Sequence, residues 1–527
     1  MTKEKNKYPI ILLFLSIFAF FPNLWVRNVD LMEARNFITA REMVLDNHWL
    51  ITTLNGNLRF EKPPLPTWFT AFIMKLTGNL TDDWVLRIPA ALMGVLLVFL
   101  VYYFVKTMTK NPFHGFITAF VTMTTFMLIK TSNENNWDIY TYVFAMGVIT
   151  FWTLGMKYHQ SKHFIIAGIF FAMSILSKGP VGIYGLIIPF IISYAFVYGL
   201  NNFKENKKYI LLSIVLGIVL AGIWPLYMIW EHRDTFLQVM KKEKNTWSSR
   251  HVEGYLFYLD YFIYMGIWAV FSIIALKRKW SEKRVKNRKN FNFIFLWNVL
   301  IILFLSIIKM KKKRYGIPIY ITSSMLVGSI CDYYFHKAYY FLDNSDKLLI
   351  KIQTILLWVV SIGVPLFLTV NKFWKNNISF TYILVIIMLF IPFYVFLYKG
   401  KEENNKIKYT VIGSGILLIL VNNSCNWFVE HKIKNQNTIQ YPSIKSSKEF
   451  IGNLPVYSDK FYIEDSWYSG KKVKDLPTDS NENEFVYLTR DSYPLEIISD
   501  YHVIKKETFR NEKKLVYLYH LKSKGEL

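Results

Sequence analysis

Charged side chains are concentrated between Met32 and Trp68, directly after the first long apolar run of the chain. Glu33 and Arg35 stand near the start of this segment, and Lys62 stands near its end. A carboxylate can orient or deprotonate a hydroxyl group, and a cation can hold a phosphate. These residue types suit the binding of an anionic molecule and the activation of a hydroxyl. An acidic residue at a helix start also complements the helix dipole, so a purely structural role for Glu33 stays open.

The two halves of this segment predict different local structures. The stretch "LMEARNFITAREMVLDNHW" (31–49) carries good helix formers and a spaced apolar series, which predicts an amphipathic helix lying on the membrane. In "LNGNLRFEKPPLPTW" (54–68), the Asn-Gly pair predicts a tight turn, and two consecutive prolines fix an extended backbone. Glu61 and Lys62 would then be held in fixed directions, with Lys62 well placed for a lipid phosphate.

Three further positions combine charge with an adjacent apolar run. Lys178 in "SKGP" lies between two such runs, where an ionisable residue is costly without a partner; the alternative is a lysine at a helix end that reaches out to water. Arg314 in "KMKKKRYGIP" (309–318) abuts the next apolar run and suits bidentate phosphate contact. Asp138 in "NNWDIY" opens an apolar run, either as a functional carboxylate or as the acid of a helix start.

The composition predicts a membrane protein with many transmembrane helices. Of 527 residues, 53% are hydrophobic and 18% are aromatic, and apolar runs of membrane-spanning length recur. The excess of 62 Lys and Arg over 37 Asp and Glu gives a formal net charge of +25, which we attribute to cationic loops rather than to nucleic-acid binding. Cys331 and Cys425 lie near or within apolar runs, so neither a disulfide framework nor a cysteine metal site is predicted.

Thirteen apolar runs are predicted to cross the membrane. With the N-terminus in the cytoplasm, the loops rich in Lys and Arg fall inside, led by the eight Lys and Arg of 277–289. No small-x-small cleavage site follows the first run, which therefore predicts an uncleaved transmembrane helix rather than a signal peptide. The predicted spans are 8–26, 84–105, 113–130, 138–155, 163–177, 181–199, 209–230, 257–276, 291–308, 315–334, 350–370, 378–397 and 409–427.

The predicted topology divides the chain into two domains. Residues 1–427 form a transmembrane domain with long outside segments at 27–83 and 231–256. Beyond it, the alternating stretches "EFVYLTR", "YHVIKK" and "KLVYLYHL" predict strands of a small α/β domain, 428–527, on the outside. The basic run 309–314 also falls outside, against the usual charge rule. Either the number of predicted spans is wrong at this point, or the run binds an anion at the membrane surface, which is the interpretation we favour.

An ordered series of motifs resembles a known family. The stretches "MEARNFITAREM", "NGNLRFEKPPLPTW", "SNENNWDIY", "LSKGPVGIYGLIIP", "WPLYMIWE" and "KKKRYGIPIY" occur in order within residues 8–335. Together they resemble the integral-membrane glycosyltransferases related to the bacterial lipid A aminoarabinose transferase and to protein O-mannosyltransferases. The resemblance implies a GT-C fold of about 13 transmembrane helices with a small external C-terminal domain. It also implies a polyprenyl-phosphate-linked sugar as donor.

This chain departs from the family pattern at one position. The pattern opens the first outside loop with an adjacent Asp-Glu pair, but Met32 takes the place of the Asp and leaves Glu33, with Asp30 two residues earlier. If the Asp of the pair is catalytic in the family, its role passes here to Glu33, to Asp30 or to neither. The catalytic candidates are therefore Glu33, Asp138 and Asp30. The residues that the resemblance implies for the donor phosphate are Lys62, Arg35, Lys178, Arg314 and Lys313, the last two within the cationic run Lys311–Arg314. Glu243, Trp247, His251 and Tyr315 are assigned to the sugar or acceptor pocket, the first three because they share one face if their segment is helical.

The predicted function is an inverting glycosyltransferase at the outer face of the inner membrane. It would move a sugar from undecaprenyl phosphate to a hydroxyl of lipid A, another glycan or a protein; in a eukaryote the donor would be dolichyl phosphate in the endoplasmic reticulum. No cofactor is required, although Glu61 and His251 are candidates for an auxiliary divalent metal. The alternatives are a transporter or flippase for lipid-linked sugars, which would place ionisable residues nearer the bilayer midplane, and a structural membrane protein.

Overall fold

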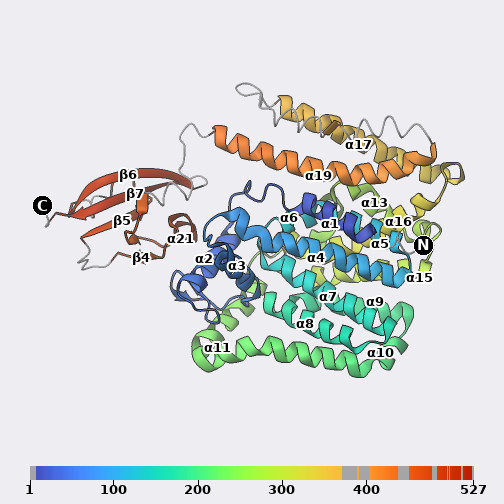
Figure 1. Ribbon diagram of the computed structural model, residues 1–527, viewed down its shortest axis with the longest axis horizontal. Coiled ribbons are helices and arrows are strands. Elements are labelled where there is room, and N and C mark those ends of the chain that lie inside the picture. The colour runs from blue at the N-terminus through green and yellow to red at the C-terminus, as the bar shows by residue number, and fades with distance from the viewer. Residues whose placement is uncertain are drawn as a thin grey trace. The chain divides into compact units, whose positions relative to one another are not determined.

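The computed structural model describes residues 7–370, 389–390, 403–436, 450–476, 483–494, 497, 499–511 and 514–524 (Figure 1). The chain folds into two compact units. The first comprises Met1–Val26, Phe60–Pro66 and Arg87–Phe428, and the second comprises Arg27–Arg59, Thr67–Leu86 and Val429–Leu527.

Long apolar helices dominate the first unit. Within the described ranges, seven helices are long and apolar enough to cross a membrane, or up to nine if each of two bent helix pairs forms one span. The prediction of a multi-pass membrane protein is confirmed, whereas the count of thirteen spans is not. The predicted span 378–397 lies outside the described residues except for 389 and 390. The seven helices are α4 (Asp83–Thr109), α7 (Trp137–Tyr158), α8 (Ser161–Lys178), α11 (Lys207–Ser249), α15 (Arg288–Ile307), α17 (Asn344–Val370) and α19 (Glu403–Gln436).

Shorter and bent helices complete this unit. Two predicted spans are sharply bent: α5 (Pro112–Met123) meets α6 (Phe126–Ser132) at 68°, and Tyr255–Tyr264 meets Gly266–Ala275 at 103°. The remaining elements are α1 (Lys7–Phe20), η2 (Ile183–Ile187), α9 (Ile188–Tyr198), α10 (Asn201–Glu205), η3 (Tyr255–Tyr258), α12 (Tyr261–Tyr264), η4 (Gly266–Trp268), α13 (Ala269–Ala275), α14 (Arg278–Glu282), η5 (Lys313–Gly316), α16 (Ile317–His336) and η6 (Tyr339–Phe341).

Helix α7 is the most deeply buried of the candidate spans, with 89% of its apolar window inside the protein. It packs along α8, and the two helices approach closely because Gly147 has no side chain. A Cβ atom at Gly147 would lie 2.4 Å from the Phe170 ring of α8, far inside van der Waals contact. This packing brings the last turn of α8 beside the first turn of α7.

Helix α11 extends into the predicted outside segment 231–256. The helix continues through this segment to Ser249, with non-helical backbone angles only at His232 (φ −136°, ψ 48°). The apolar window ends near Trp230, but the polar residues that follow are good helix formers, so helix propensity carries the helix beyond the membrane-spanning part. Phe60, which is fully buried, stacks on the His232 ring with 5.8 Å between centroids.

The second unit contains a mixed five-stranded sheet, whose strands are drawn in the red part of the colour range in Figure 1. The strand order is β4-β3-β5-β7-β6, with β3 parallel to β4 and β5 and the other neighbours antiparallel. The predicted small α/β domain is confirmed, because all three alternating stretches form strands. The strands are β3 (Val456–Ser458), β4 (Val473–Asp475), β5 (Glu484–Thr489), β6 (Tyr501–Asn511) and β7 (Lys514–Ser523).

Residues of the first outside loop pack with this sheet inside the second unit. The predicted helix is present as α2 (Leu31–Leu45), but residues 36–43 are buried on all sides of it, so it is not an amphipathic surface helix. Phe37 on it lies 5.2 Å, centroid to centroid, from Trp467 of α21 (Ile463–Ser469). Arg41 is 2% exposed and donates through Nη2 to the carbonyl oxygen of Ser466 at 2.8 Å. Helix α3 (Leu65–Thr77) completes this core. The domain boundary at residue 428 stays a prediction.

The predicted Asn-Gly turn joins β1 (Thr53–Leu54) to β2 (Asn57–Leu58). Asn55 and Gly56 have φ values of 56° and 78°, the left-handed conformations that a two-residue hairpin requires. The Asn55 amide also bonds both backbone groups of Val473, donating to the oxygen and accepting from the nitrogen at 2.6 Å each.

Replacing Asn55 with alanine is expected to destabilise the second unit by about 2–3 kcal/mol. The variant loses two hydrogen bonds and places a less tolerant residue at positive φ. Hydrogen exchange of the β4 backbone amides in the detergent-solubilised protein measures the effect. Asn57→Ala in the same hairpin is the control, and equal protection of β4 in both variants would contradict the expected role of Asn55.

Candidate functional site

Asp138 is the centre of a buried ion cluster in the first unit. It lies in the first turn of α7 and is 3% exposed. Lys178, the last residue of α8, forms an ion pair with its carboxylate. Nε of Arg314, in η5, lies 3.2 Å from Oδ2 of Asp138. Two cations therefore share a single carboxylate, and the group carries an excess of positive charge.

Tyr315 covers this group from η5. The Lys178 ammonium lies 3.9 Å from the centroid of the Tyr315 ring, a favourable cation–π position. The Tyr142 hydroxyl of α7 donates to the Tyr315 carbonyl oxygen at 3.2 Å. As a phenol, Tyr315 can donate a hydrogen bond.

Lys62 supplies a third cation in the same unit. Its Nζ lies 2.7 Å from Oε2 of Glu243, on the extended part of α11, and both side chains are partly exposed. Phe60, two residues earlier, and Pro63, the next residue, fix its direction, since Phe60 is fully buried and Pro63 limits the backbone. The prediction that this segment holds Lys62 in place agrees with these contacts, while its binding of a phosphate stays a prediction.

Electrostatic interactions connect the two groups. The charge of Lys62 acts on Asp138, and that of Glu243 acts on Lys178. Three cations face two carboxylates, so the central ion cluster, as we name Lys62, Lys178, Arg314, Asp138 and Glu243, has a net charge of one positive. Such a cluster can hold an anion through charge-assisted hydrogen bonds.

Two other lysines of the basic run, Lys311 and Lys313, bind other partners. The Lys313 ammonium pairs with Asp260 at 2.7 Å and lies 3.8 Å from the Phe257 ring centroid. The Lys311 side chain donates to the Glu253 carbonyl oxygen at 2.8 Å, and burial lowers the pKa of Lys311. In this structure the run is thus tied to residues 253–260, and of its predicted phosphate ligands Arg314 alone has an ion pair with Asp138.

The predicted shared face of Glu243, Trp247 and His251 is only partly correct. Glu243 and Trp247 lie on α11, and Trp247 is 39% exposed. His251 lies beyond the end of the helix at Ser249 and has φ 49°, so it cannot continue that face. Its backbone oxygen instead accepts a hydrogen bond from the Lys311 amide at 2.9 Å.

Glu33, Asp30 and Arg35 belong to the second unit. Asp30 is the N-cap of α2, and its side chain accepts from the amides of Met32 and Glu33 at 2.8 and 2.7 Å. Glu33 is 1% exposed and accepts in return from the Asp30 amide at 3.4 Å, which completes a capping box. Arg35 lies on the same helix, two residues after Glu33, and is half-buried. Asp30 thus has a clear structural task, and the catalytic assignments stay predictions.

The described part of the chain contains no group of side chains that forms a metal centre. Within those residues, no three His, Cys, Asp or Glu side chains are grouped so that they could hold a metal ion. A role for Glu61 and His251 as metal ligands stays a prediction.

Comparisons with known proteins identify the fold. A family model for dolichyl-phosphate-mannose-protein mannosyltransferases matches residues 61–224. The crystal structure of ArnT from Cupriavidus metallidurans, bound to undecaprenyl phosphate, matches with a TM-score of 0.71 and 15% identity and covers 97% of each chain. The chain has the GT-C fold of this structure. The predicted fold class and the resemblance to this type of enzyme are thereby confirmed.

Two sequence relatives give this GT-C protein further context. An uncharacterized protein of Aquifex aeolicus is 23% identical over 434 residues, which is 81% of each chain. The undecaprenyl phosphate-alpha-4-amino-4-deoxy-L-arabinose arabinosyl transferase 1 of Proteus mirabilis is 24% identical over 348 residues, 62% of this chain and 59% of that protein. The aligned part thus spans less than two thirds of the length of the arabinosyl transferase.

Two tyrosines at the candidate site were not among the predicted residues. The Tyr258 hydroxyl donates to the Lys312 carbonyl oxygen at 3.3 Å, and Tyr142 bonds Tyr315 as described above. Tyr142 stands four residues after Asp138, on the same face of α7, and this spacing could have identified it. Tyr258 lies in the aromatic stretch "YLFYLDYF", where the sequence pattern gives no reason to prefer one ring over another.

Proposed function

We propose that the protein transfers a sugar from a polyprenyl phosphate to a hydroxyl group of a lipid, a glycan or a protein. The observation that carries this proposal is the net positive central ion cluster, which joins Lys62, Lys178 and Arg314 around Asp138. The donor phosphate is an anion whose ester oxygen leaves with the lipid. A cluster with one positive charge in excess suits such a group.

The chemistry favours cations that act on the leaving group. As the bond between the sugar C1 and the phosphate oxygen breaks, the phosphodiester becomes a monoester and gains one negative charge. Cations already fixed around it stabilise this charge more in the transition state than in the ground state, which raises kcat. The acceptor oxygen attacks C1 from the opposite face, so the anomeric configuration inverts.

The acceptor hydroxyl must lose its proton during the attack. Asp138 is shared by Lys178 and Arg314, so we assign it to orienting these cations. We assign the role of general base to Glu33, a buried carboxylate in the segment that carries the family motif. Asp30 serves this carboxylate indirectly, because it caps the helix on which Glu33 stands. A divalent metal would be auxiliary, and a chelator added to the assay below tests its contribution.

Lys62 must exchange partners when the donor binds. In the structure it pairs with Glu243, and a donor phosphate would compete for the same ammonium. Glu243→Gln is therefore expected to lower KM for the donor about two- to fivefold. This factor corresponds to the free energy that a partly exposed ion pair contributes. Steady-state kinetics over a range of donor concentrations measures this. Glu253→Gln is the control variant, and an unchanged or higher KM in Glu243→Gln would contradict the exchange.

The site is proposed to face the outside of the inner membrane. The positive-inside rule applied to the predicted loops places Lys62, Lys178 and Arg314 on that side, with the C-terminal sheet domain. The flippase alternative is less well supported, since the fold match is to a transferase and the ionisable residues cluster at helix ends.

Transfer of a radiolabelled sugar from a panel of polyprenyl phosphate donors into membrane extract tests the proposal. The wild-type protein should consume at least one donor, and the labelled product then identifies the acceptor class. The Glu33→Gln variant, compared with Glu42→Gln in the same helix, separates a general base from a structural carboxylate. If no donor is consumed with any extract, the proposed function is wrong.

A further inference from the structure

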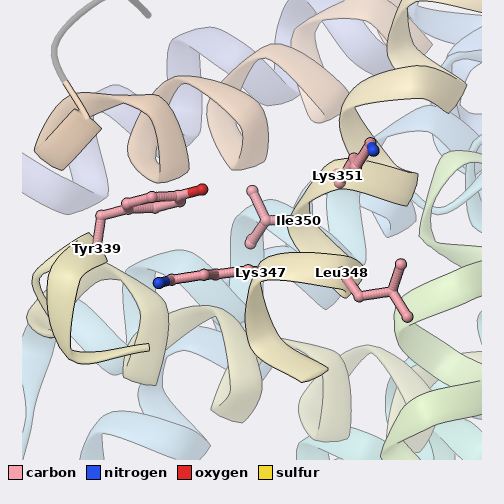
Figure 2. A pocket seen from close by; sticks show the side chains of 5 residues that line it. All are labelled: Tyr339, Lys347, Leu348, Ile350 and Lys351. Carbon is pink, nitrogen blue, oxygen red and sulfur yellow. The ribbon is translucent and has the colours of Figure 1, made fainter. Parts of the chain in front are cut away.

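A second charged site lies at the start of α17, apart from the central ion cluster. A pocket with a volume of about 250 Å³ is lined by Tyr339, Lys347, Leu348, Ile350 and Lys351. Figure 2 shows the Tyr339 and Lys347 side chains facing one another, with Lys351 one turn further along the helix. The proposed transfer reaction uses none of these residues.

The pocket offers cations without a carboxylate in its lining. Lys347 and Lys351 are spaced i, i+4 and so lie on one face of α17. The Lys347 ammonium lies 5.5 Å from the centroid of the Tyr339 ring, which holds it near the pocket. Two ammonium groups and a phenol are donors that match the oxygens of a phosphate diester.

Two nearby acidic residues, Asp343 and Asp346, are bound by a buried arginine. Arg284 is 7% exposed and donates through Nε to Asp346 at 2.5 Å, and it also pairs with Asp343. The Tyr334 hydroxyl donates to Asp346 at 2.9 Å. Both carboxylates are thus held by Arg284, although one arginine balances the charge of only one of them.

The same arginine fixes the basic loop beside the pocket. Arg284 belongs to the run 277–289 with its eight Lys and Arg, and it stacks on Trp280 at 3.6 Å. The Trp280 indole donates to the Ser345 hydroxyl at 2.9 Å, at the first turn of α17. A strongly cationic segment is therefore attached to the helix start that forms the pocket.

An exposed apolar stripe leads from the pocket along α17. This helix is a candidate membrane span, and its opposite face packs on α19 through Leu357 and Leu417. Tyr340 and Phe341, just before the helix, are 70% and 76% exposed, as aromatic residues at a membrane interface often are. The stripe consists of side chains that are 40–60% exposed, namely Leu348, Ile352, Ile355, Val359, Ile362 and Leu366.

We propose that this pocket binds an anionic glycerophospholipid. The headgroup phosphate would lie at the Lys347 ammonium beside Tyr339, with Lys351 adding positive charge one turn further along the helix, and the acyl chains would follow the apolar stripe. The stripe favours a lipid over a soluble phosphate, because only a lipid has acyl chains that can contact the apolar side chains from Leu348 onward. The proposal does not depend on the transferase activity, and the basic loop places the site on the predicted cytoplasmic face.

Native mass spectrometry of the purified full-length protein tests this site. The protein is released from nanodiscs that contain phosphatidylglycerol and phosphatidylcholine in equal amounts. Wild type should retain phosphatidylglycerol, and Lys347→Gln with Lys351→Gln should weaken its binding about 30-fold, at roughly fivefold per lysine. The control removes two exposed lysines of the basic loop, Lys279→Gln with Lys283→Gln, and should change binding much less.

Three outcomes would overturn the proposal. One is equal loss in the pocket and control variants, which would indicate unspecific surface attraction. Another is equal retention of the two lipids by wild type. The third is displacement of the lipid by millimolar glycerol 3-phosphate, which would indicate a site for a soluble anion. The melting temperature of each variant, measured in detergent, must equal that of wild type for the comparison, and Leu348→Ser provides a second variant if the double variant unfolds.

Discussion

Asp138→Asn is expected to lower kcat/KM for sugar transfer by about 10³-fold, the largest effect of any single substitution in this protein. The carboxylate is buried and holds both Lys178 and Arg314. The neutral amide leaves these two cations uncompensated, which costs about 3–5 kcal/mol for a buried charge, and they lose the geometry needed to meet the leaving phosphate. Initial rates at low donor concentration measure the loss.

A double variant separates lost function from lost folding. Asp138→Asn combined with Lys178→Met removes both partners of the buried ion pair and should recover thermal stability relative to Asp138→Asn alone, because no uncompensated lysine remains. Activity should stay low, since a cation of the cluster is gone. Recovery of activity together with stability would show that the ion pair has only a structural task.

Lys62→Ala is expected to lower kcat/KM by about 10²–10³-fold with little change in stability. The side chain is 20% exposed and its partner Glu243 is 24% exposed, so its loss leaves no deeply buried charge behind. A cation that acts on the developing charge of the leaving phosphate contributes about 3–4 kcal/mol to the transition state. The same rate assay, together with a melting temperature, checks both parts of this expectation.

Two comparison variants define the Lys62 result. Lys62→Arg keeps the charge and should retain more activity than Lys62→Ala. Lys242→Ala removes an exposed lysine next to Glu243 and should leave the rate unchanged. If Lys242→Ala loses as much activity as Lys62→Ala, the effect comes from the general surface charge, and the proposed phosphate contact is wrong.

Local sequence signals predicted the elements that position the site. The Asn-Gly pair gave the hairpin at Asn55, the apolar runs gave the long helices, and alternation gave the sheet strands of the second unit. These features depend on residues that are close in sequence, where turn chemistry and periodicity act directly. The flanking charges Asp138 and Lys178 were found for the same reason, since each stands at the end of an apolar run.

Pairings between distant residues could not be derived in this way. The sequence placed Lys313 with Arg314, but the structure pairs Lys313 with Asp260 and Arg314 with Asp138. It also placed His251 on the face of Glu243, whereas α11 ends two residues before His251. Such outcomes depend on tertiary packing and on where a helix ends, which are set by contacts between segments far apart in the chain.

The most direct test of the central claim is the release of polyprenyl phosphate during sugar transfer. Purified protein in proteoliposomes is given a synthetic undecaprenyl phosphate sugar with an acceptor extract, and mass spectrometry follows both products. The account predicts equal amounts of free undecaprenyl phosphate and transferred sugar from wild type, and strongly reduced amounts from Lys62→Ala and Asp138→Asn. Movement of the intact donor across the bilayer without its cleavage would contradict the account and indicate a flippase.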